Sequence, residues 1–110
     1  MKAIDPVEAA RTAVSAHPNR PATAVIHDSD DVRLVVFRLA PGQQVPPHTS
    51  HSTVMLRVLE GSGILSGGNG ERVCANGDLV TYEPNELHGM RATDQELLLL
   101  ATIAPRPGNR

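Results

Sequence analysis

From residue 22 onward, the chain consists of short apolar or alternating segments separated by turns rich in glycine, asparagine and proline. Each segment has the length of a β-strand, and none of them has a helical period. The tetrad Gly67-Gly68-Asn69-Gly70 is predicted to be a hairpin turn, because these residues adopt the positive φ angles of tight turns. The pattern predicts an all-β sandwich or barrel with strands at 23–27, 32–39, 53–59, 63–66, 72–75, 79–82, 88–92 and 96–103.

A short helix is predicted before the first strand. Asp5 can cap it, Pro6 suits the first helical position, and Glu8 completes an Asp-x-x-Glu capping box. The helix should end before Pro18, because the residue that precedes a proline avoids the α region. Its narrow apolar face consists of Val7, Ala10 and Val14.

A chain of 110 residues with these elements forms one domain. The predicted divisions are an N-terminal helix and linker at 1–21, a barrel at 22–105, and a polar, frayed tail at 106–110. The net charge is −2 and the basic residues are scattered, which argues against a nucleic-acid partner. No apolar segment approaches the roughly 20 residues that span a bilayer, which argues against a membrane partner.

The N-terminal residues do not have the pattern of a signal peptide, so a cytoplasmic protein is expected. Cys74 is the only cysteine, which excludes an intrachain disulfide. It follows an apolar residue in a predicted strand, and we interpret it as a small buried apolar residue.

Two histidines stand in similar surroundings, each after glycine and proline punctuation and before an apolar strand. The first segment begins at Gly42, reaches His48 after two prolines, and ends at Gly61. The second begins at Gly77 and reaches His88. Such segments can bring two imidazoles that are distant in sequence together at the mouth of a β-barrel.

The two segments resemble the paired motifs of the cupin superfamily. Members of this superfamily are small double-stranded β-helix (jelly-roll) barrels. The first family motif is Gly, five residues, His-x-His, three or four residues, Glu, six residues and Gly. Gly42, His48 and Gly61 match it, whereas Ser50 stands at the second His position and Val54 at the Glu position. The chain therefore resembles a small single-domain cupin with a degenerate first motif.

The second family motif is Gly, five residues, Pro-x-Gly, two residues and His. Gly77 and His88 match, while Glu83 and Asn85 stand at the Pro and second Gly positions. Asparagine tolerates the left-handed conformation that glycine would otherwise supply. The resemblance covers residues 22–105 and implies an all-β jelly-roll barrel with a short N-terminal helix.

The resemblance also implies a divalent transition metal (Mn, Fe, Ni, Zn or Cu), which cupins typically hold with three His and one Glu. On a regular strand His51 would point outward, because side chains alternate. A bulge in the polar segment 49–53 would turn it inward, and His48, His51 and His88 would then form a three-histidine metal site. Glu86, two residues before His88, is a remote substitute for the missing carboxylate ligand. The alternative is a metal-free pair of histidines with hydrogen-bonded rings.

A ligand cavity is predicted beside the histidines. Side chains that share one face of the strand after His48, together with one from the strand after His88, should line it: Ser50, Val54, Leu56, Val58 and Met90. The resemblance implies a small organic ligand and a metal-dependent dioxygenase, isomerase or decarboxylase. The alternative is a metal-free binding or regulatory protein without catalytic activity.

The segment Leu97-Leu98-Leu99-Leu100 is apolar on both strand faces. A small barrel buries only one face of a strand internally, and the predicted helix is too short to cover all of the other. We therefore expect a homodimer in which apolar barrel faces pack together.

Overall fold

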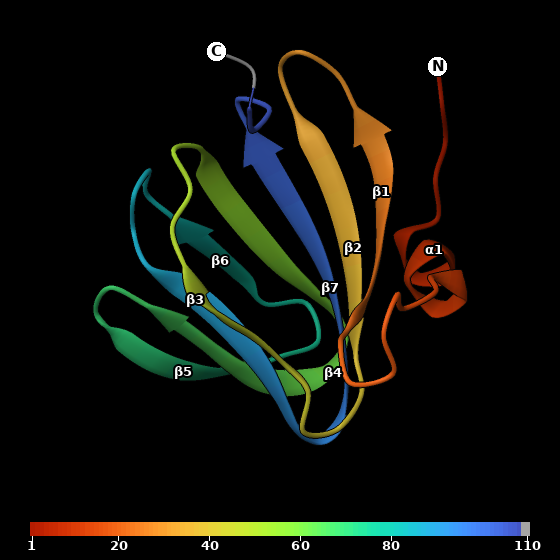
Figure 1. Cartoon of the computed structure of the whole chain (residues 1–110), viewed down its shortest axis with the longest axis vertical. Helices are drawn as coiled ribbons and strands as arrows, with labels where there is room; N and C mark the ends of the chain where they lie inside the picture. Colours follow the sequence, from red (N-terminus) through yellow and green to blue (C-terminus); the bar gives the residue numbers. More distant parts are fainter. Residues whose placement is uncertain (109–110) are drawn as a thin grey trace.

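The computed structural model describes residues 1–108 and contains one short helix and seven strands (Figure 1). The strands form one antiparallel sheet, in which β1-β2-β7-β4-β5 are neighbours, β3 pairs with β7, and β6 pairs with β4. This folded sheet is a jelly-roll barrel, which confirms the predicted fold class. The elements are α1 (Pro6–Thr12), β1 (Ala22–Asp28), β2 (Arg33–Leu39), β3 (Gln44–His48), β4 (Thr53–Gly67), β5 (Gly70–Ala75), β6 (Leu79–Tyr82) and β7 (His88–Ala104).

Two long strands, β4 and β7, replace two pairs of predicted short strands. They pair with each other along most of their length, and the register shifts between Val58 and Glu60 and again between Gly61 and Gly63. Gly61 has a φ of 83°, and a Cβ there would lie only 2.0 Å from the carbonyl oxygen of Glu96. The glycine that predicted a break therefore lets the strands bend and approach closely without ending.

Strand β3 was not predicted, because Pro46 and Pro47 lie within it. Proline has no N–H to donate to a ladder, so it is tolerated only in edge strands or at bulges. β3 pairs only with β7, and its register shifts between Val45 and His48. The proline pair therefore marks an edge strand in a segment for which no strand was predicted.

Helix α1 is shorter than predicted. The carboxylate of Asp5 accepts hydrogen bonds from the first free backbone amides, as the capping box predicts. The helix ends at Thr12 because Ala13 is already extended, with a ψ of 142°. The expected continuation to Pro18 is wrong, and Val14 lies outside the helix with its side chain 84% exposed.

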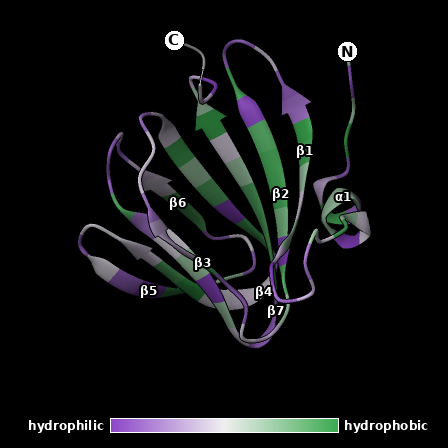
Figure 2. Cartoon of the chain, viewed as in Figure 1, coloured by the Kyte–Doolittle hydropathy of each residue, from purple (hydrophilic) through white to green (hydrophobic). Residues whose placement is uncertain are grey.

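The helix covers the outer face of the leucine segment. Ala10 is fully buried and packs in one cluster with Val36 and Leu98. On the opposite face of β7, Leu97 and Leu99 belong to the barrel core. Figure 2 shows hydrophobic residues along β2, β4 and β7, the strands that supply most of both clusters. Part of the apolar surface that was expected to meet a second copy is thus buried within the chain.

Within residues 1–108 there is no helix of the length and hydrophobicity needed to cross a membrane.

Candidate functional site

His48 and His88 meet at one end of the barrel. His48 is the last residue of β3 and His88 the first of β7, and the antiparallel pairing of these strands places the two residues opposite each other. Their ring centroids are 4.3 Å apart, with the planes tilted by 59°. The structure thus brings together the two histidines that stand 40 residues apart in the sequence.

Both rings are anchored in the same way. Nδ1 of His48 lies 3.0 Å from the carbonyl oxygen of Pro46, and Nδ1 of His88 lies 3.0 Å from the carbonyl oxygen of Glu86. A carbonyl only accepts, so each Nδ1 must carry the proton and donate it. Each neutral ring then has its free lone pair on Nε2.

Burial favours the neutral form of His88, whose side chain is only 6% exposed. Desolvation lowers the pKa of His88, and the nearby His48 lowers it further, against an opposing effect of the Glu86 carbonyl. His88 is therefore a neutral imidazole at neutral pH, able to accept a hydrogen bond or bind an electrophile through Nε2.

His51 lies in the loop of residues 49–52 that connects β3 to β4. The strand-parity argument does not apply there, and the expected bulge is a short loop. Nδ1 of His51 lies 2.9 Å from the side-chain oxygen of Asn85, and the ring lines the same cavity as the other two histidines. No three His, Cys, Asp or Glu side chains within residues 1–108 are grouped closely enough to hold a metal ion. The three-histidine metal site therefore stays a prediction.

Asn85 has two roles at a position where the family motif has glycine. Its φ is 68°, which is the left-handed conformation expected from the sequence. Its backbone N–H donates to the carbonyl oxygen of Ser50 at 2.7 Å, and its side chain holds His51. The asparagine thus ties the loop of His51 to the turn before His88, which a glycine could do only through its backbone.

The three histidines border a cavity of about 360 Å³. Of the predicted ligand-binding residues, Ser50, Val54, Leu56 and Met90 line it. Val58 is not among the lining residues and is instead buried in the barrel core. The complete lining is Phe37, His48, Thr49, Ser50, His51, Ser52, Val54, Leu56, His88, Gly89, Met90, Ala101, Ile103, Pro107 and Gly108.

The cavity has an apolar lining and a polar border. Its lining contains no Asp, Glu, Lys or Arg, so the three histidines are its only ionisable side chains. The apolar residues that the sequence analysis missed are Phe37, Ala101 and Ile103, which come from β2 and β7. Alternation within these strands could have indicated Ala101 and Ile103, since they continue the inward-facing series of Leu97 and Leu99.

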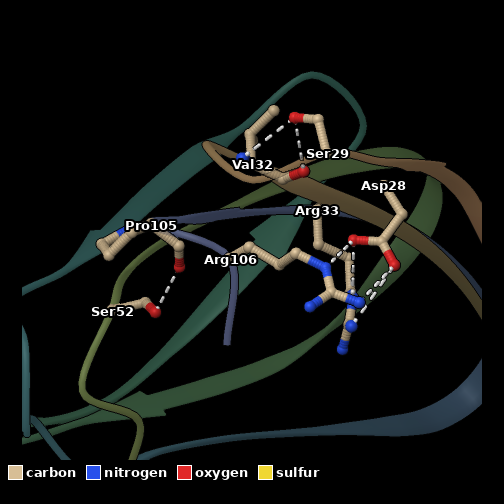
Figure 3. A network of polar contacts seen from close by, with 7 residues as sticks. All are labelled: Asp28, Ser29, Val32, Arg33, Ser52, Pro105 and Arg106. Atoms are coloured by element: carbon tan, nitrogen blue, oxygen red, sulfur yellow. Dashed lines mark hydrogen bonds and ion pairs between the residues drawn. The ribbon is translucent and has the colours of Figure 1, made fainter. Parts of the chain in front are cut away.

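Residues 106–108 were expected to belong to a frayed tail, but Pro107 and Gly108 line the cavity. Figure 3 shows the polar contacts that hold this segment. The hydroxyl of Ser52, which is 2% exposed, donates to the carbonyl oxygen of Pro105 at 2.6 Å. Arg106 donates to both carboxylate oxygens of Asp28, at 2.6 and 3.1 Å. These contacts place Pro107 and Gly108 against the cavity, while residues 109–110 lie outside the described part of the chain.

The paired arginines also affect Asp28. The hydrogen bond from Arg106 is the largest cause that lowers the pKa of the Asp28 carboxyl to about 2; burial opposes it, and the weaker hydrogen bond from Arg33 adds to it. The carboxylate is therefore charged at every physiological pH, and the ion pair that holds the C-terminal segment is permanent in that range.

Glu86 does not face the histidine cavity. Its carboxylate accepts hydrogen bonds from the backbone N–H of Gly68 at 2.9 Å and of Glu83 at 3.0 Å. These two bonds lower the pKa of Glu86, with Gly68 the larger cause. The interpretation of Glu86 as a substitute metal ligand is not supported, because the side chain joins two turns on another side of the barrel.

A profile of the cupin domain matches residues 35–103, more than half of the chain, and the chain therefore belongs to the cupin family. No curated protein sequence matches it significantly. The TT1209 protein of Thermus thermophilus is 26% identical, with a TM-score of 0.80 over 88% of this chain and 94% of its own. An RmlC-like cupin of Desulfovibrio desulfuricans is 28% identical, with a TM-score of 0.80 over 96% and 97%.

A predicted oxalate decarboxylase of Thermotoga maritima shares the fold at 20% identity, with a TM-score of 0.73 over 77% of this chain and 80% of its own.

Proposed function

We propose that this cupin binds a small organic acid in the histidine cavity, with the acid group at Nε2 of His48 and His88. The observation that supports this proposal is the composition of the cavity lining, in which the histidines are the only ionisable side chains among apolar and small polar residues. An apolar ligand body packs on Phe37, Leu56 and Met90, and a single polar group is directed to the rings. The volume of about 360 Å³ suits a small metabolite.

The paired rings suit an acid because each supplies an Nε2 lone pair. The carboxylic acid proton can transfer to one Nε2, which leaves an imidazolium facing a carboxylate. Inside an apolar cavity that ion pair is stronger than in water. The carboxylate has no proton left to donate, so Nε2 of the second ring bonds to it only when that ring is protonated as well.

The test is an NMR titration of metal-free protein with pentanoate, whose chain fits the apolar lining. The variants His48→Gln and His88→Gln remove one ring each, and His27→Gln is the matched control, because His27 lies in β1 and does not line the cavity. Both cavity variants should weaken pentanoate binding at least about tenfold, the effect of losing one charge-assisted hydrogen bond. Equal affinity in all four proteins would overturn the proposal.

A second candidate function is metal-dependent catalysis, and the anchoring of the rings favours it. All three histidines place Nδ1 against a carbonyl or amide oxygen, which is how metal-binding imidazoles are commonly oriented with Nε2 free. The rings of His48 and His88 fit such a role as they stand, whereas His51 would have to move closer to them, because residues 1–108 hold no three such side chains grouped closely enough for a metal ion. A bound transition metal would supply Lewis-acid or redox chemistry, as in a dioxygenase, isomerase or decarboxylase. The cavity residues would orient the substrate and exclude water.

Elemental analysis of protein purified without a histidine tag tests this second function. Stoichiometric Mn, Fe, Ni, Zn or Cu that is lost in His48→Ala and retained in His27→Ala would support it. No bound metal, together with an unchanged melting temperature when these ions are added, would exclude it and leave a metal-free binding protein.

The homodimer and the cytoplasmic location remain predictions. The burial of Leu98 under α1 reduces the apolar face available to a second copy, while Val25 of β1 remains 57% exposed. Light scattering at micromolar concentration tests the dimer, which a monomeric mass would contradict.

A further inference from the structure

A second cavity, of about 500 Å³, lies between β5 and β6. Both strands pair with the same edge of β4, β6 with Met55 and its neighbours and β5 with Ile64 and its neighbours. Because β4 bends between these points, β5 and β6 diverge from their connecting turn and do not pair with each other (Figure 1). The cavity occupies this fork and shares no lining residue with the histidine cavity.

Tyr82 lies between the two cavities. Its ring lines the fork cavity, and its centroid is 5.0 Å from that of His88, which lines the other. The tyrosine is 3% exposed, and its hydroxyl has no hydrogen-bond partner among residues 1–108. A buried hydroxyl without a partner is unfavourable by about 1–3 kcal/mol, so a molecule that brings an acceptor to it gains that interaction.

The hydroxyl is a donor at physiological pH. Burial, and then the nearby Cys74 and Glu86, raise the pKa of Tyr82 to about 12. The edge of the Tyr82 ring lies close to the Glu86 carboxylate, since a Cβ added at Gly67 would be 3.2 Å from Cε1 of Tyr82 and 3.1 Å from Oε2 of Glu86. All three residues line the fork cavity. The site therefore offers one neutral O–H donor beside apolar groups.

Carboxylates provide the complementary acceptors. Glu86 is fixed by the N–H groups of two turns, and Asp78 accepts from the N–H of Ala75 at 2.8 Å. Glu71 is paired with Arg91, and the only cation of the lining itself is Arg72. A carboxylate accepts several hydrogen bonds, so these groups favour a ligand that donates. They disfavour an anion.

We propose that the fork cavity is a second binding site, for a small uncharged molecule that carries both a carbonyl oxygen and an N–H donor on an apolar body, as a primary amide does. The carbonyl oxygen accepts from Tyr82, the N–H group donates to Glu86, and the apolar body packs on Leu65 and Val80. This assignment does not depend on what the histidine cavity binds.

Benzamide and benzoate are matched probes, because they have the same shape and differ in charge. In an NMR titration to about 20 mM, a range that covers the weak affinity of so small a ligand, benzamide should shift the amide signals of Gly70, Cys74 and Val80 saturably. Benzoate should bind at least about tenfold more weakly, because it meets the carboxylates. Saturable shifts confined to the histidine cavity, no saturable shift, or equal affinity for both probes would overturn the proposal.

Tyr82→Phe removes only the hydroxyl and should weaken benzamide binding about fivefold, the effect of one neutral hydrogen bond. Ser50→Ala is the control in the histidine cavity and should leave benzamide affinity unchanged. Glu86→Gln keeps the side-chain size and removes the charge, so the preference for benzamide over benzoate should narrow. Unchanged affinity in Tyr82→Phe, or an unchanged preference in Glu86→Gln, would contradict the assigned contacts.

Discussion

Replacing Ser52 with alanine tests how the C-terminal segment is held against the histidine cavity. The hydroxyl is almost completely buried and donates to the Pro105 carbonyl oxygen at 2.6 Å. Its removal leaves that carbonyl without its partner, which costs about 1–3 kcal/mol. For a domain of this size the melting temperature should fall by about 5–15 °C. Urea unfolding and calorimetry measure the two quantities.

Ser29→Ala is the matched control, because the Ser29 hydroxyl donates to the Val32 carbonyl oxygen and accepts from the Val32 N–H, both at a longer distance of 3.3 Å, in the turn between β1 and β2 (Figure 3). It should cost less than about 1 kcal/mol. Ser52→Ala should also weaken pentanoate binding, since Pro107 and Gly108 line the cavity. Equal stability losses in the two variants, or unchanged pentanoate affinity in Ser52→Ala, would refute the reasoning.

Asp28→Asn should lower stability above about pH 4, and the difference should shrink as the pH falls and disappear below about pH 2, because hydrogen bonds from arginine lower the carboxyl pKa from 3.8 to about 2. The stability that the charged carboxylate contributes is fully present above the pKa of the unfolded state and is lost as the pH falls through the pKa of the folded state. Urea unfolding at stepped pH measures this contribution. A stability difference between the variant and the parent protein that does not depend on pH would contradict the prediction. Gly61→Ala should destabilise the fold far more than Gly70→Ala. Both glycines have positive φ, but only at Gly61 would the new Cβ lie 2.0 Å from a backbone oxygen of β7, so similar urea midpoints would be inconsistent with the bend. Asp5→Ala should cost about 1 kcal/mol through loss of the helix cap, and an unchanged melting temperature would show that the cap is dispensable.

The sequence predicted the barrel well because turn chemistry is local. The turn at Gly67 to Gly70 and the left-handed Asn85 follow directly from residue type, and both are present. The long strands β4 and β7 could not be predicted in the same way. Whether Gly61 ends a strand or bends it depends on the close approach of β7, which is a tertiary contact.

The candidate site was predicted only in part, because some of its residues follow from local spacing and others from tertiary contacts. The spacing around His48 and His88 indicated that they meet, and Val54, Leu56 and Met90 were found from strand alternation. The contribution of Pro107 had no sequence signal, because it depends on hydrogen bonds and an ion pair between distant segments. Strand parity also could not predict which way the His51 side chain points, because this residue lies in a loop.

The central claim is that His48 and His88 present Nε2 to a ligand inside a cavity that is otherwise uncharged. Long-range ¹H–¹⁵N NMR of the imidazole rings, in metal-free protein near pH 8, observes these nitrogens directly. We expect both rings in the Nδ1–H tautomer near pH 8, and Nε2 signals that shift saturably when pentanoate is added at about pH 5, where the acid still carries part of its proton. Protonated Nε2 atoms with free Nδ1 atoms, or Nε2 signals that do not respond to pentanoate, would contradict the claim.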